Sequence, residues 1–195
     1  MAQAEGAGPP PERDVELAAQ TALTKLYAKH GRDVLAYALR RAPSAEDAAD
    51  ALADTFLVAW RRLDRVPPEP DARLWLYGVA RRSLANQRRG AERRGRLAER
   101  LRVEASAVLE TRARDDERER VLTALATLRA DDRELLLLVG WEGLTPAEAA
   151  RVLEISPVAA RARLHRARRR LGKALEARAH ELTHPIAGPQ MEAPR

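Results

Sequence analysis

The sequence predicts an all-α protein of two small helical domains, joined by a flexible linker, with a helix-turn-helix in the second domain. Helix formers dominate the 195 residues, while aromatic residues make up only 4%. Apolar residues recur at helical spacing in two blocks, 14–92 and 116–178. The charged segment 93–115 between them has little apolar content and is predicted to be the linker. We expect a disordered N-terminus over 1–13 and a loose C-terminal tail over 179–195.

The charge of the chain favours an anionic partner. The net charge is +6 and the isoelectric point is about 10.4. Only three of the 35 basic residues are lysine, a bias that a GC-rich genome can also produce. The placement of the arginines therefore carries more weight than their number.

Composition also limits the function classes and the location. The chain has no cysteine, which excludes disulfides, thiolate catalysis and cysteine-ligated zinc, and which fits a reducing cytoplasm. The N-terminal "MAQAEGAGPPPERD" lacks a basic stretch followed by an apolar one, so we expect no signal peptide. The longest apolar run, around "LLLLVGW", is far shorter than the roughly 20 residues of a membrane span. We expect a cytoplasmic protein without membrane insertion.

The first block begins with a helical pattern over 14–42, for which we expect a break near Gly31 and an end at Pro43. Ser44 is a suitable N-cap for a long second helix, because Glu46 and Asp47 follow it and acidic residues stabilise a helix N-terminus.

An apolar stripe identifies the buried side of that second helix. Leu52, Phe56, Trp60 and Leu63 recur at helical spacing, so we expect all four to be buried. The prolines of "VPPEP" (66–70) predict a loop.

A third helix follows the loop, with Asp71 as a candidate cap. We expect Trp75 to pack in the core together with Leu76, Val79 and Leu84. The far end of this helix becomes strongly basic, since 81–102 holds nine arginines against Glu92 and Glu99.

The second block has two clear helix starts. Thr145 can cap a helix with Pro146 at its first position and Glu148 at its third, which is the pattern of a capping box. Ser156 can cap the next helix, which begins with Pro157. Before them, Val121, Leu125 and Leu128 mark one helix, and "RELLLLVGW" marks another whose Leu135 to Leu138 and Trp141 are expected to pack the domain.

The two capped helices, 145–153 and the one from Pro157, are separated by the short turn "LEIS", as in a helix-turn-helix. Leu164, Ala167, Leu171 and Leu175 fall on one face of the second helix, whereas Arg161, His165, Arg168 and Arg169 lie largely off it. Arginine can bond guanine O6 and N7 together in the major groove. A solvated charged helix is the alternative, but the preceding capped helix favours DNA recognition.

These segments resemble bacterial RNA polymerase sigma factors of the extracytoplasmic-function (ECF) group. "WEGLTPAEAARVLEIS" with "RARLHRARRRL" resembles the promoter-reading C-terminal domain, or region 4. "SAEDAADALADTFLVAWRRLDR" resembles the polymerase-binding helix of region 2, and "ARLWLYGVARRSLANQRR" resembles its −10-element helix. The resemblance covers roughly residues 20 to 178, with both domains in the family's order.

The chain departs from the family pattern at several positions. Ala53-Asp54 stand where the family often has Gln-Glu, Arg82 replaces a common Asn, and Asn86 replaces a frequent Asp. Val158-Ala159-Ala160 replace the usual Gly-Thr-Val. These changes bear on promoter sequence and polymerase affinity more than on the class.

The resemblance implies a specificity subunit for transcription initiation and not an enzyme. Its partners would be promoter DNA and core RNA polymerase, through the clamp helices of the largest subunit and the flap of the second. An anti-sigma factor is a further partner that the family often has. The loop 64–73 would hold an unstacked base, as in the family, and the two-domain layout predicts sensitivity to the −35/−10 spacing. No cofactor or metal is expected.

Three sets of residues are candidates for these roles. Those expected to read the −35 element are Arg161, Arg163, His165, Arg166 and Arg169. Those expected to bind the −10 element are Arg73, Arg81, Arg82, Asn86, Arg88 and Arg89. Those expected at the polymerase interface are Asp50, Asp54 and Leu57, because two like charges four residues apart repel unless a partner relieves them.

Other classes fit less well. The sequence has no Gly-rich phosphate loop, nucleophile motif or metal cluster, and the spaced pair His180 and His184 has no evident third ligand. A conventional helix-turn-helix regulator that binds duplex DNA without polymerase is the main alternative. A general arginine-rich RNA-binding protein is a third, disfavoured because the arginines follow the helical phase.

Overall fold

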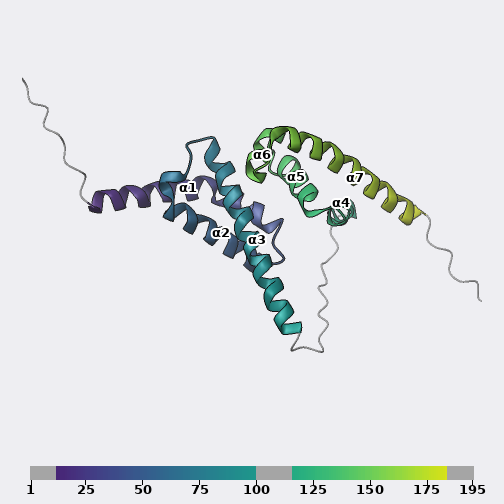
Figure 1. Cartoon of the computed structure of the whole chain (residues 1–195), viewed down its shortest axis with the longest axis horizontal. Coiled ribbons are helices and arrows are strands. Elements are labelled where there is room, and N and C mark those ends of the chain that lie inside the picture. The colour runs from purple at the N-terminus through teal and green to yellow at the C-terminus, as the bar shows by residue number, and fades with distance from the viewer. Residues whose placement is uncertain (1–11, 100–115, 184–195) are drawn as a thin grey trace, which may run out of the picture. The chain divides into compact units, whose positions relative to one another are not determined.

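The computed structural model describes residues 12–99 and 116–183, and every element in these ranges is helical (Figure 1). The chain forms two compact units that divide between Ala105 and Ser106, within the segment expected to be a linker. The expected all-α fold is confirmed.

The first unit consists of three helices and one short turn. α1 spans Glu12–Leu39, α2 spans Ala45–Arg61 and α3 spans Asp71–Glu99. A turn of 3-10 helix, η1 (Leu63–Arg65), and the proline loop 66–70 connect α2 to α3. Ser44 caps α2 as predicted, with its Oγ accepting from the backbone N–H of Asp47 at 3.0 Å.

The expected break near Gly31 is wrong, because α1 runs through this residue without interruption. Gly31 is buried, and the ring of Tyr27 lies 3.4 Å from the point where a Cβ on Gly31 would stand. Packing of α1 against α2 and α3 outweighs the cost of about 1 kcal/mol for a glycine within a helix.

Aromatic pairs join α1 to the other two helices. The stacked rings of Tyr37 and Tyr77 link α1 to α3, with centroids 4.9 Å apart. Tyr27 meets the ring of Phe56 on α2 edge-on, at 4.8 Å. Both geometries are favourable for aromatic rings, so these pairs position the three helices.

The buried side of α2 differs from the expected stripe. Phe56 is buried, but Leu52 and Leu63 are only partly buried and Trp60 is exposed. The buried side is instead formed largely by small residues: Ala48, Ala51, Thr55 and Ala59. Small side chains allow helices to approach closely. The prediction considered only the spacing of large apolar residues and therefore missed this small-residue side.

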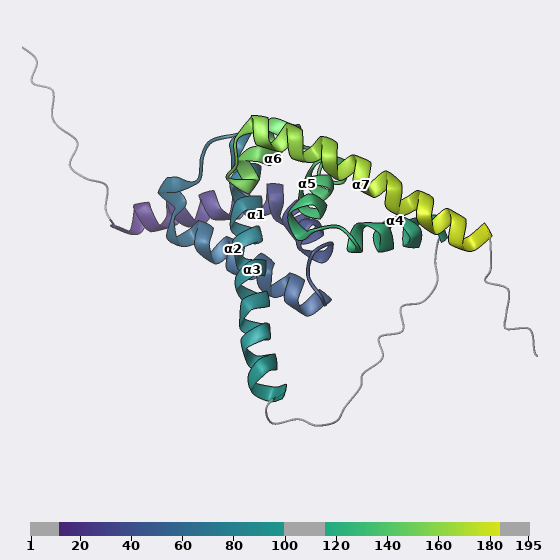
Figure 2. The same cartoon turned by 45° about the vertical axis from the view of Figure 1, so that its right-hand side comes forward.

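In the second unit, three short helices pack along a long one. α4 (Asp116–Ala126), α5 (Ala130–Gly140) and α6 (Pro146–Leu153) all contact α7 (Pro157–Thr183), as Figure 2 shows. Leu125, Leu128 and Leu137 form one apolar cluster, against which Val121, Leu136 and Leu171 pack. The prediction that Trp141 packs the domain is wrong, since it caps the end of α5 and is 46% exposed.

Two helices extend beyond the boundaries expected from sequence. α3 continues over 93–99 into the expected linker, and α7 continues over 179–183 into the expected tail. Disorder was predicted over 1–13, but Glu12 and Arg13 already belong to α1. Residues 1–11 and the rest of the other two segments lie outside the described residues.

Candidate nucleic-acid interface

The predicted helix-turn-helix is present in α6 and α7. Thr145 Oγ1 accepts from the backbone N–H of Glu148 at 3.2 Å, and the Glu148 carboxylate accepts from the backbone N–H of Thr145 at 2.7 Å. This reciprocal pair is the predicted capping box. The turn bends at Glu154, which adopts a left-handed conformation with φ of 57°. Ser156 then caps α7, with its Oγ accepting from the N–H of Ala159 at 3.1 Å.

One side of α7 packs into the second unit. Leu164 and Ala167 are buried, as expected, together with Ala160, while Leu171 and Leu175 are partly buried. α6 packs against α7, and its Ala149 and Ala150 are both buried and small.

The outward side of α7 is basic. Its exposed side chains include Arg161, His165, Arg166, Arg168 and Arg169. The helix therefore has the two-sided character that a recognition helix needs, with an apolar side holding it in place and a cationic side free.

Arg163 lies apart from this exposed group. It is partly buried, and its Nη1 lies 3.6 Å from Oδ2 of Asp131 in the first turn of α5. Arg170 makes a parallel contact, with Nη1 donating to Oδ2 of the buried Asp132. Two neighbouring carboxylates thus bind two arginines seven residues apart on α7.

The candidate −10 residues lie along α3. Arg82, Asn86, Arg88 and Arg89 are exposed, whereas Arg73 and Arg81 are only partly so. Arg89 donates a hydrogen bond to the side-chain oxygen of Asn86, which brings two of the candidates into contact.

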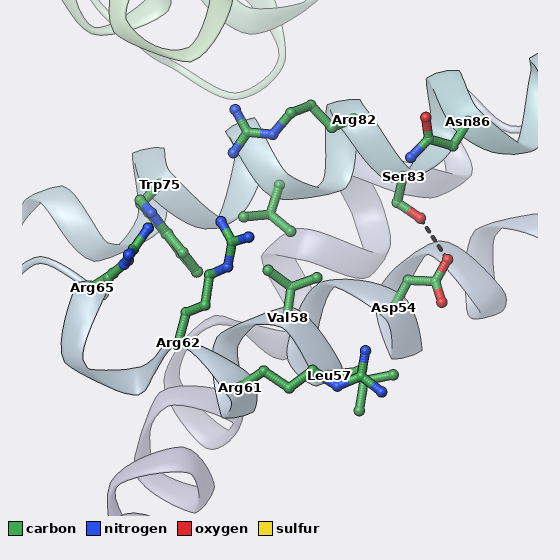
Figure 3. Close-up of a pocket in the computed structure, with 11 residues that line it drawn as sticks. Asp54, Leu57, Val58, Arg61, Arg62, Arg65, Trp75, Arg82, Ser83 and Asn86 are labelled. Atoms are coloured by element: carbon green, nitrogen blue, oxygen red, sulfur yellow. Dashed lines mark hydrogen bonds between the residues drawn. The ribbon is translucent and has the colours of Figure 1, made fainter.

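An open hollow of about 650 Å³ lies between α2 and α3 (Figure 3). Its lining combines arginines with an aromatic wall and short polar groups. The residues that line it are Asp54, Leu57, Val58, Arg61, Arg62, Arg65, Trp75, Val79, Arg82, Ser83 and Asn86.

The charges in this hollow favour an anionic ligand. Four of the lining side chains are arginines and only one is a carboxylate. Arg62, which follows the last residue of α2, points toward α3 on the side of Trp75 (Figure 3). The prediction that Trp75 is a core residue is wrong in part, because it is partly exposed and lines the hollow. An indole beside guanidinium groups can accommodate a base and its phosphate.

The candidate polymerase residues share an exposed face of α2. Asp50, Asp54 and Leu57 stand at helical spacing on it, and Leu57 is 45% exposed. Asp54 already has an internal partner, because the Oγ of Ser83 donates to its Oδ2 at 2.7 Å. Trp60, 37% exposed, borders this face.

A group of polar side chains ties the proline loop to α1. Glu69 Oε1 accepts from Nε2 of His30 at 2.6 Å and from Nζ of Lys29 at 2.9 Å. Hydrogen bonds from Lys29 and then His30 hold the pKa of Glu69 below its ordinary value of 4.5. His30 is only 4% exposed, and its Nδ1 has no hydrogen-bond partner among the described residues.

Sequence reasoning missed several of these residues. It singled out neither Arg62 nor the His30–Glu69 pair, and it included Arg65 only as part of the loop 64–73. The contacts of these residues depend on segments that meet only in the folded unit. The prolines around Glu69 predicted that it lies in a loop. Nothing in the sequence indicated that this loop contacts His30, which is 39 residues from Glu69.

Metal-binding clusters and membrane-spanning helices are both absent from the described part of the chain. No cluster of three or more potential metal-ligating side chains is present there, although His184 and the side chain of His180 lie outside it. Within 12–99 and 116–183, none of the helices combines the length and apolar character needed to cross a membrane.

Two family models match the chain. Sigma-70 region 2 matches residues 26–94, which include the hollow, and sigma-70 region 4 matches residues 118–171, which include the helix-turn-helix. Each match lies within one of the two compact units.

Characterised relatives align over most of the chain. RNA polymerase sigma factor CnrH of Cupriavidus metallidurans is 34% identical over 81% of this chain and 88% of its own length. ECF RNA polymerase sigma factor SigL of Mycobacterium tuberculosis is 33% identical over 82% of this chain and 92% of its own. The structure of CnrH in complex with the cytosolic domain of CnrY is similar, with a TM-score of 0.60, 30% identity, and coverage of 83% of this chain and 94% of that one.

Proposed function

Because the chain belongs to the ECF group of bacterial RNA polymerase sigma factors, which direct promoter-specific transcription, we propose that it binds core RNA polymerase and selects −35 and −10 elements. It acts as a specificity subunit of the polymerase and contributes no catalytic centre. Its place of action is the cytoplasm, where core polymerase and promoter DNA are found.

The −35 element is read by the exposed side of α7. This rests on one observation above all: the capped helix-turn-helix buries Ala160, Leu164 and Ala167 and leaves the basic side free. Base contacts come from Arg161, His165 and Arg166 on the first turns, since this end of a recognition helix enters the major groove. Arg169 lies further along, where contact with the phosphate backbone is the expected role.

Arg163 has a different role in this proposal. Its ion pair with Asp131 directs it toward α5, so it serves mainly to orient α7. Of the five residues expected to contact the −35 element, Arg163 contacts the bases least directly.

The −10 element is bound by α3 and the hollow. The exposed Arg82, Arg88 and Arg89 neutralise phosphates, with Arg73 and Arg81 contributing from partly buried positions. An unstacked base of the separated strand enters the hollow beside Trp75, while Asn86 lines the hollow further along α3. Stabilising one strand in this way assists promoter melting, because each captured base no longer returns to the duplex.

Core polymerase binds the exposed face of α2 that holds Asp50, Asp54 and Leu57. Carboxylates beside an exposed leucine suit a partner helix with basic and apolar side chains. The flap of the second polymerase subunit contacts the second unit. A regulatory protein partner is also proposed, since CnrH was solved in complex with the cytosolic domain of CnrY.

Run-off transcription tests this function. Purified core polymerase is incubated with a genomic promoter pool, with and without the protein, and the transcripts are mapped. Initiation that depends on the protein, at promoters sharing one −35/−10 pair with fixed spacing, is the expected result. Duplex binding without polymerase, and no initiation with it, would contradict the proposal in favour of a conventional regulator.

A further inference from the structure

Val158, the second residue of α7, is exposed without an evident structural reason. Its exposed fraction is 67%, the highest among the exposed large apolar side chains of the described residues. A β-branched side chain loses rotamer freedom in a helix, so valine stabilises a helix less than alanine does. At this position it therefore contributes neither to packing nor to helix formation.

The position of Val158 is that of a DNA-facing residue. Residues 158, 161, 162, 165 and 169 are spaced by three, four, seven and eleven, so they share one side of α7. All five side chains are exposed, and three of them are Arg161, His165 and Arg169. Val158 begins this row at the end of the helix that enters the groove.

The chemistry of the groove identifies what an apolar side chain can contact there. Among the unmodified bases, the apolar group displayed in the major groove is the C5-methyl of thymine. An isopropyl group among cationic side chains cannot accept or donate a hydrogen bond, so it cannot recognise the polar base edges. Removal of its surface and of the methyl surface from water favours their contact.

We propose that Val158 is a specificity-determining residue that contacts the C5-methyl of a thymine in the −35 element. The small, exposed Ala162, one turn further along, leaves space for the base to approach. This inference rests on the proposed function, because it requires α7 to lie in the major groove of that element.

Deoxyuridine provides the test, since it pairs as thymine does and lacks only the methyl group. A promoter obtained by run-off transcription is prepared with each −35 thymine, on either strand, replaced in turn by deoxyuridine. The affinity of the holoenzyme for each duplex is then measured. One replacement is expected to weaken binding about three- to fourfold, the effect of exposing a single apolar carbon.

Variants of Val158 link this effect to the side chain. Val158→Ala removes the two γ-methyl groups at a site where alanine favours the helix, and it should abolish the deoxyuridine effect at that one position. Val158→Thr keeps one methyl and should keep part of the effect. Leu122→Ala changes another exposed apolar residue of the same unit, 48% exposed on α4, and should leave the effect unchanged.

The outcomes separate this inference from the function on which it rests. Initiation without any deoxyuridine effect, a −35 element without thymine, or an equal effect in Val158→Ala would overturn the role of Val158 alone. Failure of the holoenzyme to initiate at all would overturn both the proposed function and this inference.

Discussion

The hydroxyl of Ser83 on α3 donates a 2.7 Å hydrogen bond to the carboxylate of Asp54 on α2 (Figure 3). Asp54 was expected to need an external partner because it lies four residues from Asp50. The structure gives it an internal one, at the edge of the hollow. Asp54 can therefore link two helices and still present its second carboxylate oxygen to a partner.

Replacing each residue of this pair should separate the two roles. Ser83→Ala and Asp54→Ala should each lower the free energy of unfolding by about 1 kcal/mol, since each removes one partly exposed hydrogen bond. Only Asp54→Ala should also weaken the affinity for core polymerase. Urea unfolding and a core-polymerase binding titration measure the two effects, and equal affinities for the two variants would exclude a role for Asp54 at the interface.

Substitutions on α7 should affect promoter choice according to where each arginine points. Arg161→Ala and Arg166→Ala should each cost about 1–3 kcal/mol at one cognate base pair and relax selection there. Arg169→Ala should weaken binding to all sequences alike, as expected for a phosphate contact. Holoenzyme binding to a panel of single-base promoter variants gives both quantities.

Arg163→Ala is the matched control for those variants, because this side chain faces Asp131 instead of the exposed side. It should leave the ranking of promoter variants unchanged. A shift in preference at a single base pair would show that Arg163 reads the DNA directly.

The two residues of the Asp132–Arg170 ion pair should differ in how much stability is lost when each one is replaced. Arg170→Ala leaves the carboxylate of Asp132, whose side chain is 7% exposed, without its cation, and we expect a loss of about 2–3 kcal/mol in unfolding free energy. Asp132→Asn should cost less, because the half-exposed Arg170 can be hydrated instead. Denaturant unfolding is the measurement, and the double variant should be more stable than Arg170→Ala alone.

The Glu69 contacts should make the proline loop sensitive to acid. The pKa of Glu69 is lowered by its hydrogen bonds from Lys29 and His30, so its contribution to stability is present above pH 4.5 and is lost as the pH falls below it. Glu69→Gln should therefore be less stable than the parent at neutral pH, with a difference that shrinks in acid. Thermal unfolding across this range tests it, with Asp33→Asn at an exposed position within α1 as the control. A difference that stays constant with pH would rule out the carboxylate as its source.

Local sequence signals were sufficient to predict the structure of much of the second unit. Thr145, Glu148 and Ser156 act within three residues of their partners, so their caps could be predicted from spacing and are present. The apolar side of α7 followed from helical periodicity for the same reason. Trp141 could not be placed in this way, because its exposure depends on where α5 ends against its neighbours.

In the first unit, helical periodicity predicted only part of the buried surface. Phe56 was correctly expected to be buried, but Trp60, one turn later in the same stripe, is exposed. Periodicity identifies a side of a helix, whereas the width of the buried strip depends on the shape of the helices that cover it.

The helical class, the order of the two domains, the helix-turn-helix and the family could be predicted from the chain alone, because these depend on propensity, capping and short motifs. The contact of Arg163 with Asp131, the exposure of Val158 and Arg161, and the contact of Glu69 with His30 became apparent only in the folded units. These pairings join residues far apart in the chain. They depend on how each helix is rotated about its own axis when it packs, and local sequence does not specify that rotation.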